Sequence, residues 1–148
     1  MTAPLVFLLD VNLLIALAWP SHIHHAPAHQ WFDRHGHAAW ATCPLTQLAF
    51  VRISANRRIL PDAVSPRDAM AVLQRIAAQP GHRFWADDIA PVDAPGFRSV
   101  ALVGHRQVTD AYLLALAEHH HGRLATFDRG IADLLPGAHR GALIELLG

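Results

Sequence analysis

Three aspartates, Asp10, Asp110 and Asp128, are the residues of this chain best suited to metal-dependent chemistry. Asp10 follows a continuous apolar run at 5–9, and Asp128 follows a second predicted strand at 124–127. Runs of this kind are typical of strands buried on both faces of a parallel sheet. Asp110 lies in the first turn of a predicted helix. Parallel strands end at one edge and the following helices begin there, so we expect all three carboxylates at the edge where open α/β sheets bind ligands.

The helix that carries Asp110 is expected to direct this carboxylate into the protein. Asp110 shares the spacing i, i+3, i+4, i+7 of a core-facing stripe with Leu113, Leu114 and Ala117. Taken singly, each aspartate could instead cap a helix or complement a helix dipole. Their convergence on one edge favours a functional site. The same face pattern predicts two more inward polar side chains at this edge, Gln47 and Asn12.

A cluster of three carboxylates needs a cation, because carboxylates held close together repel and one of them otherwise becomes protonated. The 12 basic residues are all Arg, so the cation must be an Arg or a metal ion. Oxygen ligands with a neighbouring amide and hydroxyl suit Mg²⁺ or Mn²⁺. The chemistry that this implies is attack of a metal-activated water on a phosphodiester.

Composition excludes several other classes of site. Without Lys the chain has neither a phosphate-binding GxxxxGK[ST] loop nor a Schiff-base nucleophile. The single Cys43 excludes an internal disulfide and a zinc site built on paired cysteines. The 12 acidic residues balance the 12 basic ones, so there is no overall basic field for nucleic acid, and any such contact must be local.

The pattern of strands and helices predicts a single α/β domain over residues 1–148 with a mainly parallel central sheet flanked by helices. Apolar residues make up 52% of the chain, which is enough for a real core. We expect strands at 5–9, 38–41, 83–86, 124–127 and 142–147, and helices at 12–19, 25–35, 44–55, 66–79 and 109–121. Thr109 is expected to cap the last of these helices and Gly122 to terminate it. The segment 87–104 is expected to be loop with one helical turn at most.

The apolar start of the chain resembles a secretion signal only superficially. No basic segment precedes it, and Asp10 and Asn12 interrupt it. It is also too short to span a bilayer. We therefore expect a cytoplasmic protein.

Four sequence blocks resemble those of PIN-domain ribonucleases, specifically the VapC toxins of bacterial toxin–antitoxin pairs. The blocks are LLDVNLLIAL around Asp10, WATCPLTQLAFVRIS around Gln47, VTDAYLLALA around Asp110 and LATFDRGI around Asp128. They occur in the order typical of the family and span about residues 5 to 135. No single block is specific, but four in order are.

The resemblance implies a parallel sheet, an acidic site for Mg²⁺ or Mn²⁺, endonucleolytic cleavage of RNA, a homodimer and a cognate antitoxin that blocks the site. By position in the blocks, Asp10 and Asp110 would be the main metal ligands, and Asp128 would assist the metal or position its water. Three further residues would orient these carboxylates without contacting the ion: Asn12, Thr109 and Thr126. Such outer partners fix the geometry of the ligands.

Gln47 departs from the family pattern, because many members carry Glu in this block. Gln offers the same reach with a neutral carbonyl oxygen, so the local charge is −3 rather than −4. We expect weaker metal binding and only a doubtful second ion. The alternative function is a catalytically weak PIN-like module that binds RNA or protein.

Several basic residues have two interpretations. Arg129 directly follows Asp128 and could meet a substrate phosphate, or it could simply be exposed at a helix start. Arg52, with Arg57 and Arg58, could form a short RNA-binding patch or ordinary surface charge.

The 12 His include two clustered runs, at 22–25 and 119–121, which suggest a transition-metal site. Surface His are more often solvated, and three adjacent His on a helix cannot all face one ion. A non-catalytic interaction module is the remaining rival to an enzyme, since the apolar content could serve a partner surface.

Overall fold

The computed structural model describes residues 3–94, 104–135 and 137–148, and it contains a five-stranded sheet. The strands lie in the order β3-β2-β1-β4-β5, and every neighbouring pair is parallel. Their bounds are β1 Phe7–Leu9, β2 Trp40–Thr42, β3 His82–Phe84, β4 Arg123–Thr126 and β5 Ile144–Leu146. The predicted α/β class with a parallel sheet is therefore confirmed, and the expected strands each shift by a few residues at most.

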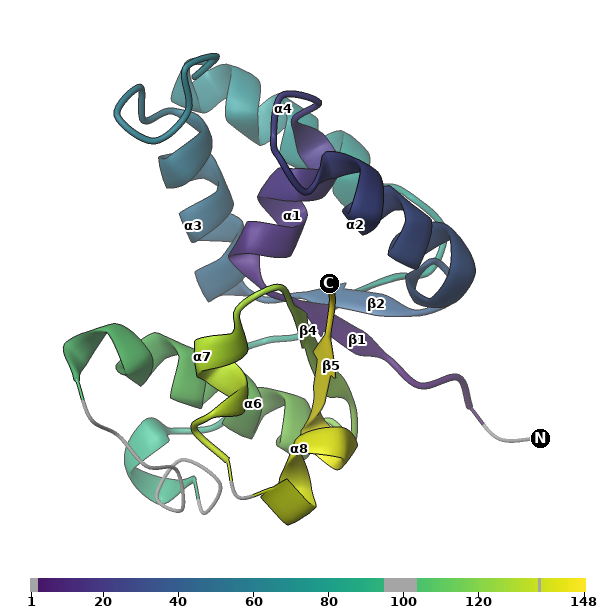
Figure 1. The fold of residues 1–148 in the computed structure, drawn as a ribbon. Coiled ribbons are helices and arrows are strands. Elements are labelled where there is room, and N and C mark those ends of the chain that lie inside the picture. The colour runs from purple at the N-terminus through teal and green to yellow at the C-terminus, as the bar shows by residue number, and fades with distance from the viewer. Residues whose placement is uncertain (1–2, 95–103, 136) are drawn as a thin grey trace.

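Helices connect these strands and cover both faces of the sheet. In chain order they are α1 Val11–Ala18, α2 His25–Trp31, the π-helix η1 Phe32–Gly36, α3 Pro44–Ser54, α4 Pro66–Ala77, the 3₁₀ turns η2 Pro91–Asp93 and η3 His105–Gln107, α6 Val108–His119, α7 Arg129–Ala132 and α8 Gly137–Leu143. Figure 1 shows α1–α4 gathered on one side of the sheet and α6–α8 on the other. Within the described ranges no helix has the length and apolarity needed to cross a bilayer.

The central strand β1 is buried on both faces, as its continuous apolar run predicts. Phe7 and Leu9 belong to the core beneath α1–α4, whereas Leu8 points the other way into the core around α6. Successive side chains of a strand point to opposite faces, so three apolar residues in a row serve two cores. Leu8 pairs with Ala41 on one side and with Leu124 on the other, and all three are fully buried.

The helix starts follow local sequence signals. Ser65 caps α4 by accepting a hydrogen bond from the Asp68 N–H at 3.1 Å, with Pro66 at the first helical position. Pro44 likewise opens α3 after Cys43. The helix predicted at 25–35 is present, but it changes at Phe32 from α2 to the π-helical turn η1.

Two sequence expectations about the second half of the chain need revision, and a third is confirmed over its described part. The helix α6 begins at Val108 with Gln107 in the capping position, so the expected cap at Thr109 is wrong. Part of the strand expected at 142–147 is helical, because α8 extends to Leu143 before β5 begins. Of the loop expected at 87–104, the described part contains the single turn η2, and residues 95–103 lie outside the described ranges.

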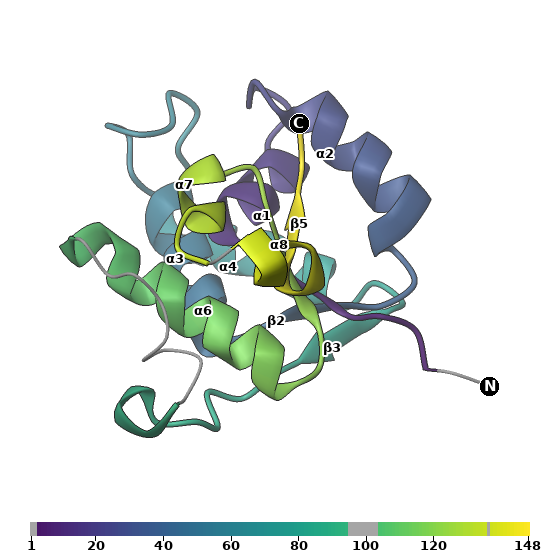
Figure 2. The ribbon, with the colours of Figure 1, turned by 60° about the horizontal axis from the view of Figure 1, so that its bottom comes forward.

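Gly122, after the end of α6, is required for space rather than for a left-handed conformation. The left-handed residue is His121, with φ 58°. A Cβ on Gly122 would lie 2.5 Å from the carbonyl oxygen of Val6 and 2.7 Å from the ring of Trp85. The turn from α6 into β4 therefore passes directly against the residue before β1 and the Trp85 indole. Figure 2 shows the end of α6 near β3, the strand that Trp85 follows.

We expect Gly122→Ala to lower the free energy of unfolding by about 2–3 kcal/mol, because a backbone carbonyl cannot move aside as a flexible side chain can. The measurement is urea denaturation followed by circular dichroism. Gly104→Ala is the matched control, since a Cβ there has nothing within 4 Å, and it should change stability by less than about 0.5 kcal/mol. Equal effects of the two substitutions would contradict this account of the turn.

Candidate active site

Asp10 and Asp128 lie side by side because β1 and β4 are neighbours in the sheet. Leu9 pairs with Ala125, and the Asp10 N–H donates to the Ala125 carbonyl at 3.0 Å. The residue after Leu9 is thus held beside the last residue of β4, Thr126, two positions before Asp128. The carboxyl edge of the sheet brings together two segments that are more than 100 residues apart in the sequence.

Asp10 is the most buried of the three aspartates, with 3% of its surface exposed. Its Oδ1 accepts a hydrogen bond from the Val11 N–H at 2.8 Å, which makes it the N-cap of α1. Its Oδ2 accepts one from the Thr126 hydroxyl at 2.8 Å. Both carboxylate oxygens of Asp10 are therefore held in place by hydrogen bonds, one from the Val11 N–H and one from the Thr126 hydroxyl.

Thr126 links the two aspartates. This fully buried residue donates its hydroxyl proton to Asp10, and the same oxygen accepts from the Asp128 N–H at 3.0 Å. One hydroxyl thereby sets the position of the Asp10 carboxylate relative to the backbone of Asp128. The contact agrees with the expected orienting role of Thr126.

Asp128 is exposed and caps α7, since its Oδ1 accepts from the Gly130 N–H at 2.8 Å. The capping interpretation considered for single aspartates thus applies to both Asp10 and Asp128. It does not exclude a further role, because a carboxylate has about four lone-pair sites and a cap uses one.

Asp110 completes the group from the first turn of α6, where it is half-buried next to the fully buried Ala111. Burial, the charge of Asp10 and the charge of Asp128, in that order, raise its pKa to about 6. The pKa of Asp10 is also raised, chiefly by burial and also by Asp128, against the lowering effect of the Thr126 and Val11 hydrogen bonds. The structure therefore brings the three carboxylates into electrostatic contact, as their positions in the sequence predict.

None of the three carboxylates forms an ion pair with a side chain that the structure describes. The ion pairs formed in this part of the chain involve Asp88 and Glu145 instead. The carboxylate oxygens of Asp10, Asp110 and Asp128 do not all lie within 4.8 Å of one another. Among the described residues, a different group of side chains has that close spacing. Mg²⁺ is usually held through one or two carboxylates with several waters, so this donor set fits such an ion without all three acids contacting it directly.

Gln47 lies at the same edge, in α3, but its side chain is engaged with the end of β2. Its Nε2 donates to the Thr42 hydroxyl at 3.0 Å, and the Thr42 oxygen lies 2.7 Å from Nε2 of His82. Burial lowers the pKa of His82, which favours the neutral ring, whose Nε2 can accept a hydrogen bond from the Thr42 hydroxyl. The amide nitrogen of Gln47 is thereby directed to Thr42, which leaves its carbonyl oxygen for other contacts.

Thr42 and His82 were missed by sequence reasoning. Thr42 is fully buried and is the last residue of β2, as Thr126 is the last residue of β4. A Thr at a strand end, a few residues before a polar residue in a helix's first turn, is the signal that would have indicated Thr42. His82 gave no such signal, because its place opposite Trp40 depends on the pairing of β2 with β3.

Two predicted orienting residues are placed differently. Asn12 is exposed, so the expectation that it faces inward is wrong, and Thr109 is exposed as well. The helix α1 has four buried residues in a row, Leu13 to Ala16, so its periodicity carried little information about which side faces water. In the described structure neither side chain forms a hydrogen bond with one of the three aspartates.

The two candidate RNA contacts, Arg129 and Arg52, are both exposed. Arg129 begins α7 immediately after Asp128. Arg52 lies in the last turn of α3, five residues beyond Gln47, which is about 7.5 Å along the helix axis. Arg129 is therefore beside the acidic group, and Arg52 is farther from it.

Comparisons with known proteins agree with this architecture. The family model described as "PIN domain" matches residues 7–134. The chain is 52% identical over 127 residues to "Ribonuclease VapC38" of Mycobacterium tuberculosis (strain ATCC 25618 / H37Rv), covering 86% of this chain and 88% of the relative. It is 45% identical over 140 residues to "Ribonuclease VapC39" of the same strain, covering 95% and 98% of the two chains.

The chain belongs to the VapC family of PIN-domain proteins. Two solved structures share the fold of this VapC-family chain. One is VapBC2 from Rickettsia felis bound to a DNA fragment from its promoter, with TM-score 0.62, 7% identity and coverage of 97% of this chain and 99% of the other. The second is FitAB bound to an IR36 DNA fragment, with TM-score 0.60, 15% identity and coverage of 95% and 94%. At these identities the likeness shows the PIN fold alone.

The raised pKa of Asp110 predicts a stability that depends on pH. From its ordinary value of 3.8 up to about 6, this carboxyl binds its proton more tightly in the folded chain than in the unfolded one. The free energy of unfolding therefore falls as pH rises through this window.

In chelator at about pH 7.5, Asp110→Asn should raise the free energy of unfolding by about 1–2 kcal/mol, after allowance for solvent screening of a half-buried group. The gain should shrink below about pH 6 and vanish near pH 4. Urea denaturation over this pH range measures it, with the exposed Asp62→Asn as control. A gain that is independent of pH would show that charge repulsion is not its source.

Proposed function

We propose that this chain is an Mg²⁺- or Mn²⁺-dependent endoribonuclease that hydrolyses RNA phosphodiester bonds at Asp10, Asp110 and Asp128. The observation that carries the proposal is the meeting of these carboxylates at the carboxyl edge of the sheet, where the Thr126 hydroxyl joins Asp10 to the backbone of Asp128. Burial, together with the charges of Asp10 and Asp128, raises the pKa of Asp110 to about 6. Three mutually repelling carboxylates without a described protein cation form a site that favours a divalent cation. The names of the relatives, ribonucleases VapC38 and VapC39, support RNA as the substrate.

Asp10 and Asp110 would hold the metal ion, with Asp128 close to them. A bound divalent ion supplies a Lewis acid that lowers the pKa of water and neutralises charge on the scissile phosphate. Thr126 keeps the Asp10 carboxylate fixed, so little rearrangement is needed when substrate arrives. Asp110, whose pKa is raised to about 6 by burial and by the charges of Asp10 and Asp128, would hold the ion in its deprotonated form.

Arg129 would be the basic residue that meets the substrate. It follows Asp128 in the chain and is exposed. A guanidinium there can bind an RNA phosphate without occupying the carboxylates. Arg52 would contact a more distant part of the backbone.

We further propose that the chain is the toxin of a toxin–antitoxin pair, acting in the cytoplasm as a homodimer and inhibited by a cognate antitoxin. The resemblance of the four sequence blocks to VapC toxins supports this assignment, and so does the fold shared with VapBC2. An Arg supplied by an antitoxin would suit the uncompensated carboxylates.

Cleavage of total RNA by the purified chain tests the proposal. With Mg²⁺ or Mn²⁺ the wild type should cleave, whereas Asp10→Asn and Asp110→Asn should each lose activity by about a hundredfold or more, because each removes a charge at the site. Chelator should abolish cleavage by the wild type.

Asp62→Asn removes an exposed carboxylate in a turn and should cleave like the wild type. If all four proteins cleave equally, with metal and with chelator, the activity belongs to another site or to a contaminant. Circular dichroism of each variant distinguishes loss of the site from loss of the fold.

The alternative function, a catalytically weak binding module, rests on Gln47 in place of Glu. Gln47→Glu restores a fourth negative charge and should tighten Mg²⁺ binding by about tenfold in calorimetry. The structure adds a cost, because a carboxylate cannot donate to Thr42 as the amide does, and stability should fall by about 1 kcal/mol.

Gln74→Glu makes the same charge change on the exposed side of α4 and is the matched control. Unchanged Mg²⁺ affinity in Gln47→Glu would place residue 47 outside the metal site. Tighter binding together with faster RNA cleavage would identify Gln47 as the cause of weak activity in the natural chain.

A further inference from the structure

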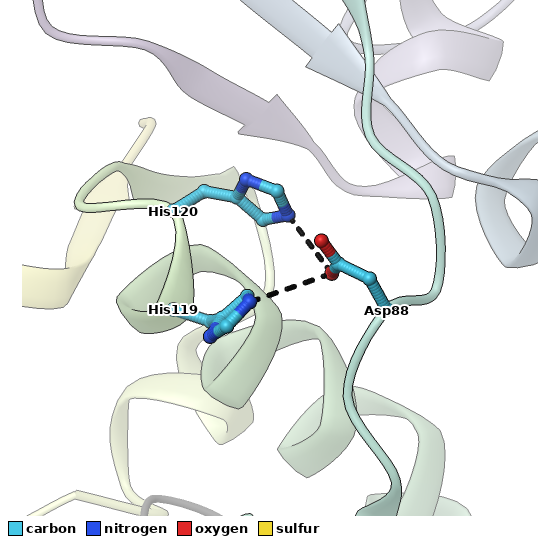
Figure 3. Close-up of side chains that lie close together, drawn as sticks. All are labelled: Asp88, His119 and His120. Atoms are coloured by element: carbon cyan, nitrogen blue, oxygen red, sulfur yellow. Dashed lines mark hydrogen bonds and ion pairs between the residues drawn. The ribbon is translucent and has the colours of Figure 1, made fainter.

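A second group of potential metal ligands lies at the C-terminal end of α6. Figure 3 shows His119 and His120 directed at the carboxylate of Asp88, which comes from the segment that follows β3. Nε2 of His120 lies 3.1 Å from Oδ1 of Asp88, and Nε2 of His119 lies 3.7 Å from the same oxygen. Within the described residues, this is the one group of three or more His, Cys, Asp or Glu whose ligand atoms all lie within 4.8 Å of one another.

These separations fit a tetrahedral ion. Two ligands each about 2.0–2.1 Å from a zinc ion in tetrahedral geometry are about 3.3 Å apart. The two distances to Asp88, 3.1 and 3.7 Å, lie on either side of this value. Small rotations of the exposed Asp88 and His119 side chains would equalise them.

A hydrogen-bond network alone does not account for the arrangement. His120 forms a hydrogen bond with Asp88, but His119 is too far away at 3.7 Å to form one. One carboxylate oxygen thus faces two imidazole nitrogens and bonds to one of them. A cation between the three atoms would satisfy both rings.

The His120 ring is held in position from behind. It stacks on the indole of Trp85, with ring centroids 4.4 Å apart and planes inclined by 10°. Trp85 is itself buried and packs against Gly122. A ligand whose ring is already oriented loses less conformational entropy on binding.

The end of the helix explains how two consecutive His face one carboxylate. His119 is the last residue of α6 and His120 caps it, so the backbone turns away from helical geometry between them. His121 continues with φ 58° and is not part of the group. The expectation that three adjacent His cannot share one ion therefore holds, while two of them can face a common partner.

The other His run does not gather in this way. His25 bonds to the Ala16 carbonyl at 2.7 Å, at the end of α1, and the His24 ring stacks on Phe127. His29 bonds to the Leu17 carbonyl at 2.8 Å. The rings of His25 and His29 therefore hold α2 against α1, and the His24 ring packs on the residue after β4. These are structural uses.

We propose that Asp88, His119 and His120 form a second metal site that takes Zn²⁺ or another borderline transition-metal ion. Two imidazole nitrogens and one carboxylate oxygen are the donors that zinc accepts, with water as a fourth ligand, whereas Mg²⁺ prefers oxygen alone. The site is separate from the acidic group, because His119 is nine residues beyond Asp110 on α6, about 14 Å along the helix.

The bound ion would fasten the segment after β3 to α6. That segment is already attached at one point, where the Tyr112 hydroxyl donates to the Ile89 carbonyl at 2.8 Å. Asp88 precedes Ile89, so an ion at the second point would join the segment to the far end of the same helix. A ligand that binds only the folded chain raises its stability.

Zinc binding by the untagged, full-length, chelator-treated protein tests the proposal. Calorimetry is done in the Asp10→Asn/Asp110→Asn background, so that the acidic group does not contribute. We expect one Zn²⁺ per chain and no competition by Mg²⁺. In this background Asp88→Asn and His119→Gln should each weaken Zn²⁺ binding by about tenfold or more.

His121→Asn is the matched control, because Asn tolerates the left-handed backbone and the residue lies outside the group. It should bind Zn²⁺ like the parent. Zn²⁺ should also raise the midpoint of thermal unfolding of the parent and of His121→Asn, but not of Asp88→Asn or His119→Gln.

Absence of Zn²⁺ binding, or binding that Asp88→Asn and His119→Gln leave unchanged, would overturn the proposal and reduce the group to a surface hydrogen bond. Equal loss in His121→Asn would overturn it as well. The result is independent of RNA cleavage, so failure of either proposal leaves the other standing.

Discussion

The site depends on one constraint, the parallel pairing of β1 with β4 at the centre of the sheet. That pairing sets Leu9 opposite Ala125, and so it places Asp10 beside Thr126. The Thr126 hydroxyl then joins the Asp10 carboxylate to the backbone of Asp128 through two hydrogen bonds. A shift of one residue in this register would turn the three apolar residues of β1 to the wrong cores and separate the carboxylates. Fold and site are therefore specified by the same contact.

The acidic group works against the stability of the fold that holds it. Burial and mutual repulsion raise the pKa values of Asp10 and Asp110, so the ionised chain without a cation is strained electrostatically. Two apolar cores, one on each face of the sheet, offset this cost. A divalent ion or a partner's basic side chain would relieve it. Binding of a catalytic metal ion and binding of an inhibitor's basic side chain would then both be favoured by relief of the same repulsion between carboxylates.

The helix α6 connects the two candidate metal sites. Its first turn carries Asp110, the proposed oxygen ligand, and its C-terminal end carries His119 and His120, the proposed nitrogen ligands. Between them, residues 111 to 117 are all buried. The helix is thus fixed along its length, which keeps both ends in place. The donor atoms differ at the two ends of α6. A hard cation such as Mg²⁺ would therefore prefer the oxygen donors at the start of the helix, and a borderline cation such as Zn²⁺ the nitrogen donors at its end.

The fold class and the meeting of the three aspartates can be predicted from the order of residues alone. Apolar runs that end in Asp indicate buried parallel strands, and such strands share a carboxyl edge whatever their order. Only the tertiary structure decided which polar side chains support them. Asn12 and Thr109 turned out exposed, while Thr42 joined Gln47 to His82 through the pairing of β2 with β3. The grouping of His119 and His120 with Asp88 likewise needs two segments about 30 residues apart to pack together. Periodicity reports which side of one element is apolar, whereas a hydrogen bond depends on the distance between two elements, and packing alone sets that distance.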